Sequence, residues 1–132
     1  MFKGIHHFVV AVENLEEAAA QYAMIFDVPV PPFGDAPARG FKNAVFDFGD
    51  TQVELITPFD ETGPVARRIS TSGEGPYMLA MSVDSIDTTV AHLREKGVRL
   101  IGDPGEGKPL DKAQIFIHPQ SANGLLIRIA ER

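Results

Sequence analysis

The sequence has 132 residues, enough for one compact domain or for two half-size units that share a sheet. Twelve Lys and Arg against eighteen Asp and Glu give a net charge of -6, which argues against nucleic acid as a partner. The absence of cysteine excludes disulfides and thiolate chemistry. The longest apolar run, residues 8–12, is too short to span a membrane, and residues 1–4 lead into a strand pattern without a signal-peptide core. We therefore expect a cytoplasmic protein.

The first predicted elements are a strand over residues 5–12 and a helix after it. Asn14 and Glu17 have the spacing of a capping box, which is typical of a helix start, and the apolar residues that follow share one helical face. Four prolines between residues 27 and 40 forbid a central strand, so this segment is predicted to be an edge segment followed by a loop. Two further β-rich runs complete a β-α-β-β-β order, at residues 41–48 and 51–58.

The same order of elements returns in the second half. A strand is predicted over residues 77–83, Ser85 can cap the helix that follows, and Gly97 ends that helix. Residues 83–87 match residues 12–16 in residue type at every position, which indicates an internal duplication. The three β-rich runs of this half are residues 98–101, 113–118 and 125–130. The predicted modules are about 1–60 and 76–132, and the connector between them holds one or two helical turns at residues 65–69.

Four short motifs carry a resemblance to a known family: HFVVAV followed by LEEA in residues 7–18, TQVEL at 51–55, KGVRL at 96–100 and HPQS at 118–121. In this order they resemble the vicinal oxygen chelate superfamily of glyoxalases, bleomycin resistance proteins and dioxygenases, and among these the methylmalonyl-CoA epimerase branch. The resemblance implies a single α+β domain in which two β-α-β-β-β modules form one cup-shaped mixed β-sheet with the helices outside.

The resemblance also implies a divalent metal, held by one residue from each of four strands. Two of the four positions fall on His7 and Glu54, which can coordinate an ion. The other two fall on Met78 and Arg128, where the family pattern has His and Glu. A guanidinium cannot be a ligand, and its charge repels a cation at short range. We therefore expect no metal cofactor in this protein. Because side chains alternate along a strand, His6 is expected to face away from His7.

Each of these residues has a structural interpretation beside the functional one. His7 is either a satisfied polar residue or a substrate-binding group, and Glu54 with Arg128 is either an internal ion pair or a functional site. Met78 is more simply explained as packing. The HPQS segment and the Asn-Gly pair after it favour a structural turn between two strands.

The function implied by the resemblance is proton transfer on a small carboxylate or acyl-CoA thioester. We expect Glu54 to be the base and Arg128 to replace the metal electrostatically. The substrate-binding residues are expected to be His7, Gln52, Met78, Ser82 and Arg128. A second base of the family is expected near residues 38–40, where the sequence has no acid. The alternative is a non-catalytic small-molecule-binding protein of the bleomycin-resistance type, since a fold alone does not decide between the two. A homodimer is a further expectation.

Overall fold

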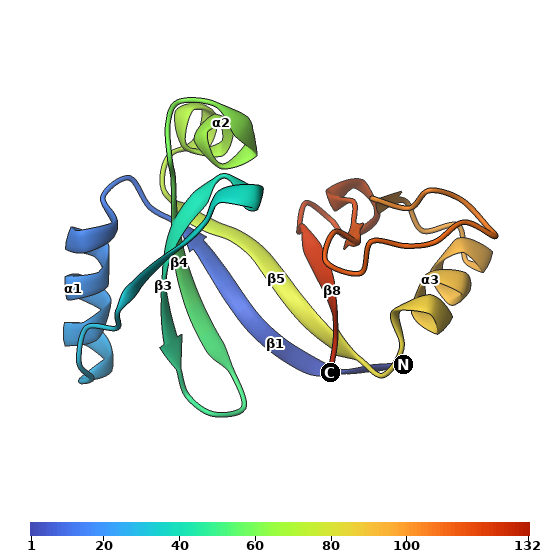
Figure 1. The fold of residues 1–132 in the computed structure, drawn as a ribbon, viewed down its shortest axis with the longest axis horizontal. Helices are drawn as coiled ribbons and strands as arrows, with labels where there is room; N and C mark the ends of the chain where they lie inside the picture. Colours follow the sequence, from blue (N-terminus) through green and yellow to red (C-terminus); the bar gives the residue numbers. More distant parts are fainter. The chain divides into compact units, whose positions relative to one another are not determined.

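The computed structural model describes the backbone of residues 1–132 and all side chains except that of Ala38, so the expected second-base segment at 38–40 lies partly outside the described side chains. Eight strands form one mixed sheet in the order β2-β3-β4-β1-β5-β8-β7-β6, and three α-helices complete the described chain (Figure 1). The predicted α+β class is therefore confirmed. The strands are β1 (Phe2–Ala11), β2 (Phe33–Ala36), β3 (Phe41–Asp47), β4 (Gln52–Pro58), β5 (Gly75–Val83), β6 (Leu100–Ile101), β7 (Phe116–Ile117) and β8 (Ile127–Glu131). The helices are α1 (Leu15–Phe26), α2 (Gly63–Ser72) and α3 (Ile86–Glu95), with 3-10 turns at Pro37–Arg39 and Pro119–Ser121.

The chain divides into two compact units. One unit is Phe8–Tyr77, and the other combines Met1–His7 with Met78–Arg132. The first residues of β1 thus belong to the unit that contains the second half of the chain. The module limits expected from the sequence, about 1–60 and 76–132, stay a prediction.

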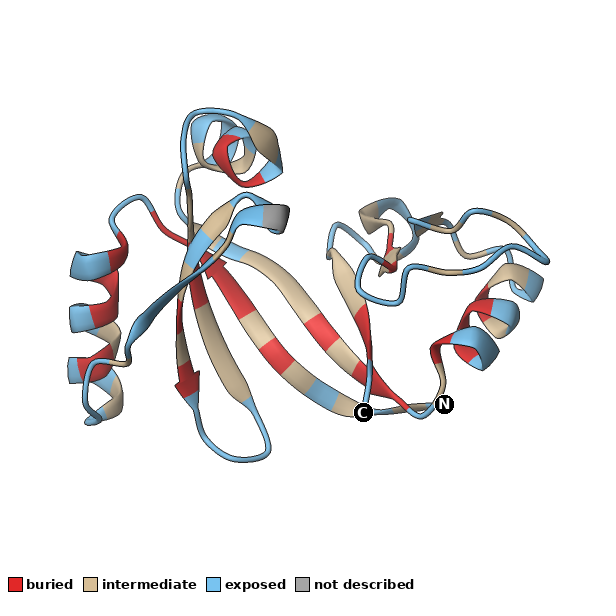
Figure 2. Cartoon of the chain, viewed as in Figure 1, coloured by how far each residue is buried: buried red, intermediate tan, exposed pale blue. Residues whose placement is uncertain are grey.

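In the unit Phe8–Tyr77, α1 packs on β3 and β4 (Figure 1). The helix begins where the sequence predicts, because the Asn14 side chain accepts a hydrogen bond from the Glu17 N–H at 3.0 Å. Figure 2 shows the buried residues of α1 on one side of the helix, and these pack with the buried residues of β3 and β4. The segment after α1 forms the edge strand β2 and then a 3-10 turn, as its prolines predict.

Helix α2 has ten residues, more than the one or two turns expected from Val65 to Ile69. Only Val65 and Ala66 of this helix are buried, and the rest of it is mostly polar. The sequence therefore lacks the apolar spacing that would predict the full helix. Pro64 lies in the first turn of the helix, where backbone N–H groups make no hydrogen bond within the helix. The proline therefore removes no helical hydrogen bond. The helix length predicted from the sequence is therefore too short, because most of α2 faces solvent.

In the unit of Met1–His7 and Met78–Arg132, α3 packs on β8 (Figure 1). Ser85 caps α3 by accepting from the Thr88 N–H at 3.2 Å, and it follows the Asn14 cap by 71 residues, the offset of the sequence repeat. Strand β8 runs parallel to β5 and antiparallel to β7. Strands β6 and β7 have two residues each, shorter than predicted, because only Leu100 and Ile101 pair with Phe116 and Ile117 in the ladder between them.

Candidate functional site

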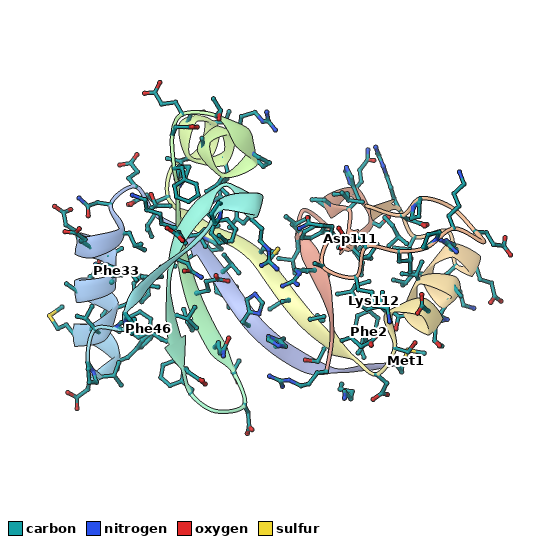
Figure 3. The ribbon with its side chains drawn as sticks, in the orientation of Figure 1. Met1, Phe2, Phe33, Phe46, Asp111 and Lys112 are labelled. Carbon is teal, nitrogen blue, oxygen red and sulfur yellow. The ribbon has the colours of Figure 1, made fainter. Side chains whose placement is uncertain are left out.

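The side chains of β4 alternate between the core under α1 and the opposite face of the sheet. Val53 and Leu55 pack in the core under α1, so Glu54 lies on the opposite face, where the alternation of the strand predicts it. Gln52 shares that face and is partly buried. On β3, Phe46 lies on the side of α1 (Figure 3), which leaves Asn43 and Val45 on the same face as Glu54.

The carboxylate of Glu54 is held by a side chain that the sequence analysis missed. The Asn43 Nδ2 donates a hydrogen bond to the Glu54 Oε2 at 2.8 Å. An amide donor on an ionised carboxylate makes a charge-assisted hydrogen bond, which is stronger than a bond between neutral groups. The signal that could have found it is an Asn within a β-rich run, where Asn is disfavoured, on the face that the alternation assigns to the site. This arrangement presents an oriented acid on a partly buried face.

The other unit carries the remaining predicted site residues. Ile127 and Ile129 pack in the core under α3, so Arg128 lies on the opposite face of β8. In the parallel register Arg128 is opposite Ala80 of β5, and therefore Met78 and Ser82 share its face of the sheet. The structure thus places these three side chains on one surface, whereas Glu54 and Gln52 belong to the other unit.

Ser82 is unusual because its hydroxyl is buried without a partner. The residue is 2% exposed, and its Oγ makes no hydrogen bond to any described residue. A buried hydroxyl without a hydrogen bond is destabilising, and its presence in a native protein calls for an explanation such as a ligand or a water molecule. A ligand group held by Arg128 could supply the missing partner, since the two residues lie on adjacent strands of one face.

His7 is buried and contacts its neighbour in the sequence. The Nδ1 atoms of His6 and His7 are 2.8 Å apart, and the two rings meet edge to face with centroids 4.9 Å apart. One Nδ1 must therefore donate and the other accept. Burial, with the charges of Arg132 and Arg128, lowers the pKa of His6 and favours its neutral form. The Cβ atoms of adjacent residues in a strand point to opposite faces, so the two rings were expected to lie apart. Their Nδ1 atoms are nevertheless in contact.

The side chains at the four family positions do not fit a divalent metal. His7 and Glu54 carry donor atoms, but Met78 offers a thioether and Arg128 a cation. The Nδ1 of His7 is also engaged with His6. Among the residues that the structure describes, no three His, Cys, Asp or Glu side chains are grouped so that they could hold an ion.

The HPQS segment forms a turn that is stabilised by its own side chains. His118 accepts a hydrogen bond from the Gln120 N–H at 2.9 Å, and Ser121 accepts one from the Arg99 N–H at 2.9 Å. Asn123 and Gly124 have φ values of 55° and 94°, the left-handed conformation that such a turn requires. These contacts support the structural interpretation of the segment.

A cavity of about 580 Å³ lies outside the predicted site, in the unit Phe8–Tyr77. Its lining includes the start of α1 and parts of β2 and β3, and it contains none of the predicted site residues. Its charged groups are three acids, Glu13, Glu16 and Asp35, against the single cation Lys42. This charge does not suit an anionic ligand, so we do not assign the site there.

The model of the glyoxalase/bleomycin resistance protein/dioxygenase superfamily matches residues 6–115, and the chain belongs to this superfamily. The resemblance inferred from the four motifs is thereby confirmed. An ethylmalonyl-CoA/methylmalonyl-CoA epimerase of Cereibacter sphaeroides is 30% identical, with 99% of each chain covered. The mitochondrial methylmalonyl-CoA epimerase of Homo sapiens is 28% identical, over 96% of this chain and 73% of that protein. The crystal structure of methylmalonyl-CoA epimerase from Mycobacterium tuberculosis has a TM-score of 0.81, at 28% identity, 98% coverage of this chain and 88% of that one.

All three relatives are named as epimerases of acyl-CoA thioesters. The solved structure among them shares the fold of this chain. None of the described helices is long and apolar enough to cross a membrane.

Proposed function

We propose that the protein is an epimerase-like enzyme that transfers the α-proton of a small carboxylated acyl-CoA thioester. The observation that carries this proposal is the Glu54 carboxylate, oriented by Asn43 on the face of the sheet opposite α1. Likeness to epimerases over the full length of the chain supports the substrate class. A cytoplasmic location and a homodimer remain predictions from the sequence.

The reaction needs a base and a positive charge. Glu54 accepts the proton from the α-carbon, and the electron pair of the broken C–H bond moves into the thioester as an enolate. The negative charge that develops on the thioester oxygen requires a cation or hydrogen-bond donors near it. Arg128 and Ser82, which share one face of β5 and β8 in the other unit, are the cation and the hydroxyl donor that the sequence predicts for this role. Return of the proton from Glu54 restores the thioester.

Exchange of the α-proton with solvent is the primary reaction to measure. Inversion at the α-carbon also needs a proton donor on the opposite face, and the sequence has no acid near residues 38–40. In heavy water, the wild type should replace the α-proton of methylmalonyl-CoA by deuterium, as followed by proton NMR. Glu54→Gln should lose this exchange by at least about 100-fold, the usual scale of general-base catalysis. Exchange at the wild-type rate in Glu54→Gln would overturn the proposal.

The second candidate is a small-molecule-binding protein without catalysis. The observation that favours it is the replacement of two family metal positions by Met78 and Arg128. A binding protein would be stabilised against heat by the acyl-CoA without exchanging its α-proton. A thermal-shift measurement beside the exchange measurement therefore separates the two candidates.

A further inference from the structure

Asn43 lies in the middle of three strands, between the candidate base and a glycine. It pairs with Gly34 of β2 on one side and with Ile56 of β4 on the other. Its Nδ2 donates to Glu54, two residues along β4 from Ile56. Its Oδ1 is turned the other way, to the backbone of Gly34, where an added Cβ would lie only 2.8 Å from it. The side-chain amide therefore fills the space that a side chain at position 34 would need.

The orientation of this amide follows from charge. A carbonyl oxygen facing the Glu54 carboxylate would repel it, so the NH₂ group faces Glu54 and the oxygen must face β2. The oxygen can approach β2 closely only because residue 34 has no Cβ. Steric space, rather than backbone conformation, explains this glycine: Gly34 is the one glycine of the described chain whose φ lies outside the positive region.

We propose that Gly34 and Asn43 are positioning residues that set the direction of the Glu54 carboxylate. This inference rests on the proposed function in so far as Glu54 is the base. An alanine at position 34 moves the end of the Asn43 side chain and with it the hydrogen bond to Glu54. The backbone tolerates the substitution, so the fold changes little in stability while the direction of the carboxylate changes.

The first experiment is a double-mutant cycle on α-proton exchange. Gly34→Ala and Asn43→Ala should each lower the turnover number about 10- to 100-fold with little change in KM, because misplacing a reacting group by about 1 Å has an effect of this size. The double variant should be no slower than Asn43→Ala alone, since the clash requires the Asn43 side chain. Additive losses, or wild-type turnover in Gly34→Ala, would overturn the inference.

A second pair of variants separates hydrogen bonding from packing. Asn43→Asp keeps the shape of the side chain but places a second carboxylate beside Glu54, so it should lose at least as much turnover at neutral pH as Asn43→Ala. A merely structural role for residue 43 would leave Asn43→Asp close to the wild type. Lys42→Ala is the matched control, because Lys42 is exposed on the same strand and precedes Asn43. It should leave turnover unchanged.

A measurement without substrate distinguishes failure of this inference from failure of the proposed function. The Asn43 side-chain NH₂ signals in the nitrogen-proton NMR spectrum should shift in Gly34→Ala and in Glu54→Gln but not in Lys42→Ala. If the wild type exchanges no thioester proton while these shifts occur, the proposed function fails and the positioning network stands. If Gly34→Ala leaves the Asn43 signals in place, the inference fails whatever the enzyme does.

Discussion

At the scale of single residues, Arg128 and Ser82 are the polar groups that share one face of β5 and β8. A guanidinium presents a planar fork that matches a carboxylate, which an ammonium group does not. We predict that Arg128→Ala abolishes binding of acidic ligands and barely weakens binding of neutral analogues, and that Arg128→Lys restores it only in part. Titration calorimetry with methylmalonyl-CoA and with a thioester lacking the free carboxylate measures the difference. Equal binding of the acid by wild type and Arg128→Ala would show that Arg128 is structural.

The Arg94–Asp103 ion pair makes a pH-dependent contribution to stability. Hydrogen bonds from the Arg94 guanidinium hold the pKa of Asp103 at about 2, below its ordinary 3.8. Because the folded-state pKa is depressed, the contribution is complete above pH 3.8 and disappears as the pH falls toward 2. Asp103→Asn should lower the free energy of unfolding by about 1 to 2 kcal/mol at pH 7. Urea denaturation from pH 7 to pH 3 checks this, and a difference that stays constant down to pH 3 would exclude the ion pair as its source.

At the scale of elements, α1 and α3 begin at equivalent positions of the sequence repeat. Loss of either N-cap should therefore lower the stability of the protein by a similar amount. Asn14→Ala removes the acceptor for the Glu17 N–H, and Ser85→Ala removes the acceptor for the Thr88 N–H. Each substitution should lower the free energy of unfolding by about 1 kcal/mol, as measured by urea denaturation. Asn14→Asp and Ser85→Thr, which keep an acceptor, should lower it much less. A loss as large in these two variants would mean that the caps contribute little.

The sequence predicted the elements where a strong local pattern exists. Capping residues and helical spacing located α1 and α3, and strand alternation located β3 and β4 with the face of Glu54. The length of α2 was missed because most of its residues are exposed, and the short strands β6 and β7 were overestimated because their length depends on pairing. The contacts of Asn43 with Glu54 and of His6 with His7 were also missed, since they depend on register and side-chain rotamers that no local pattern encodes.

At the scale of the whole molecule, two of the four family metal positions, Met78 and Arg128, carry no strong donor. We therefore predict that the purified protein carries no stoichiometric divalent metal. Elemental analysis checks this, and one ion per chain that is lost in His7→Ala would contradict it. The double variant Met78→His with Arg128→Glu restores both family donors and should bind cobalt, nickel or zinc. Met78→Leu with Arg128→Gln, which changes the same positions without adding strong donors, should bind none.

The most direct test of metal-independent proton transfer by Glu54 is the exchange rate of the methylmalonyl-CoA α-proton in heavy water after the protein has been stripped with a chelator. The wild type should retain its full rate, added cobalt should not increase it, and Glu54→Gln should be inactive with or without the ion. Loss of exchange on stripping, with recovery when cobalt is added, would contradict the account and show that this chain uses a metal after all.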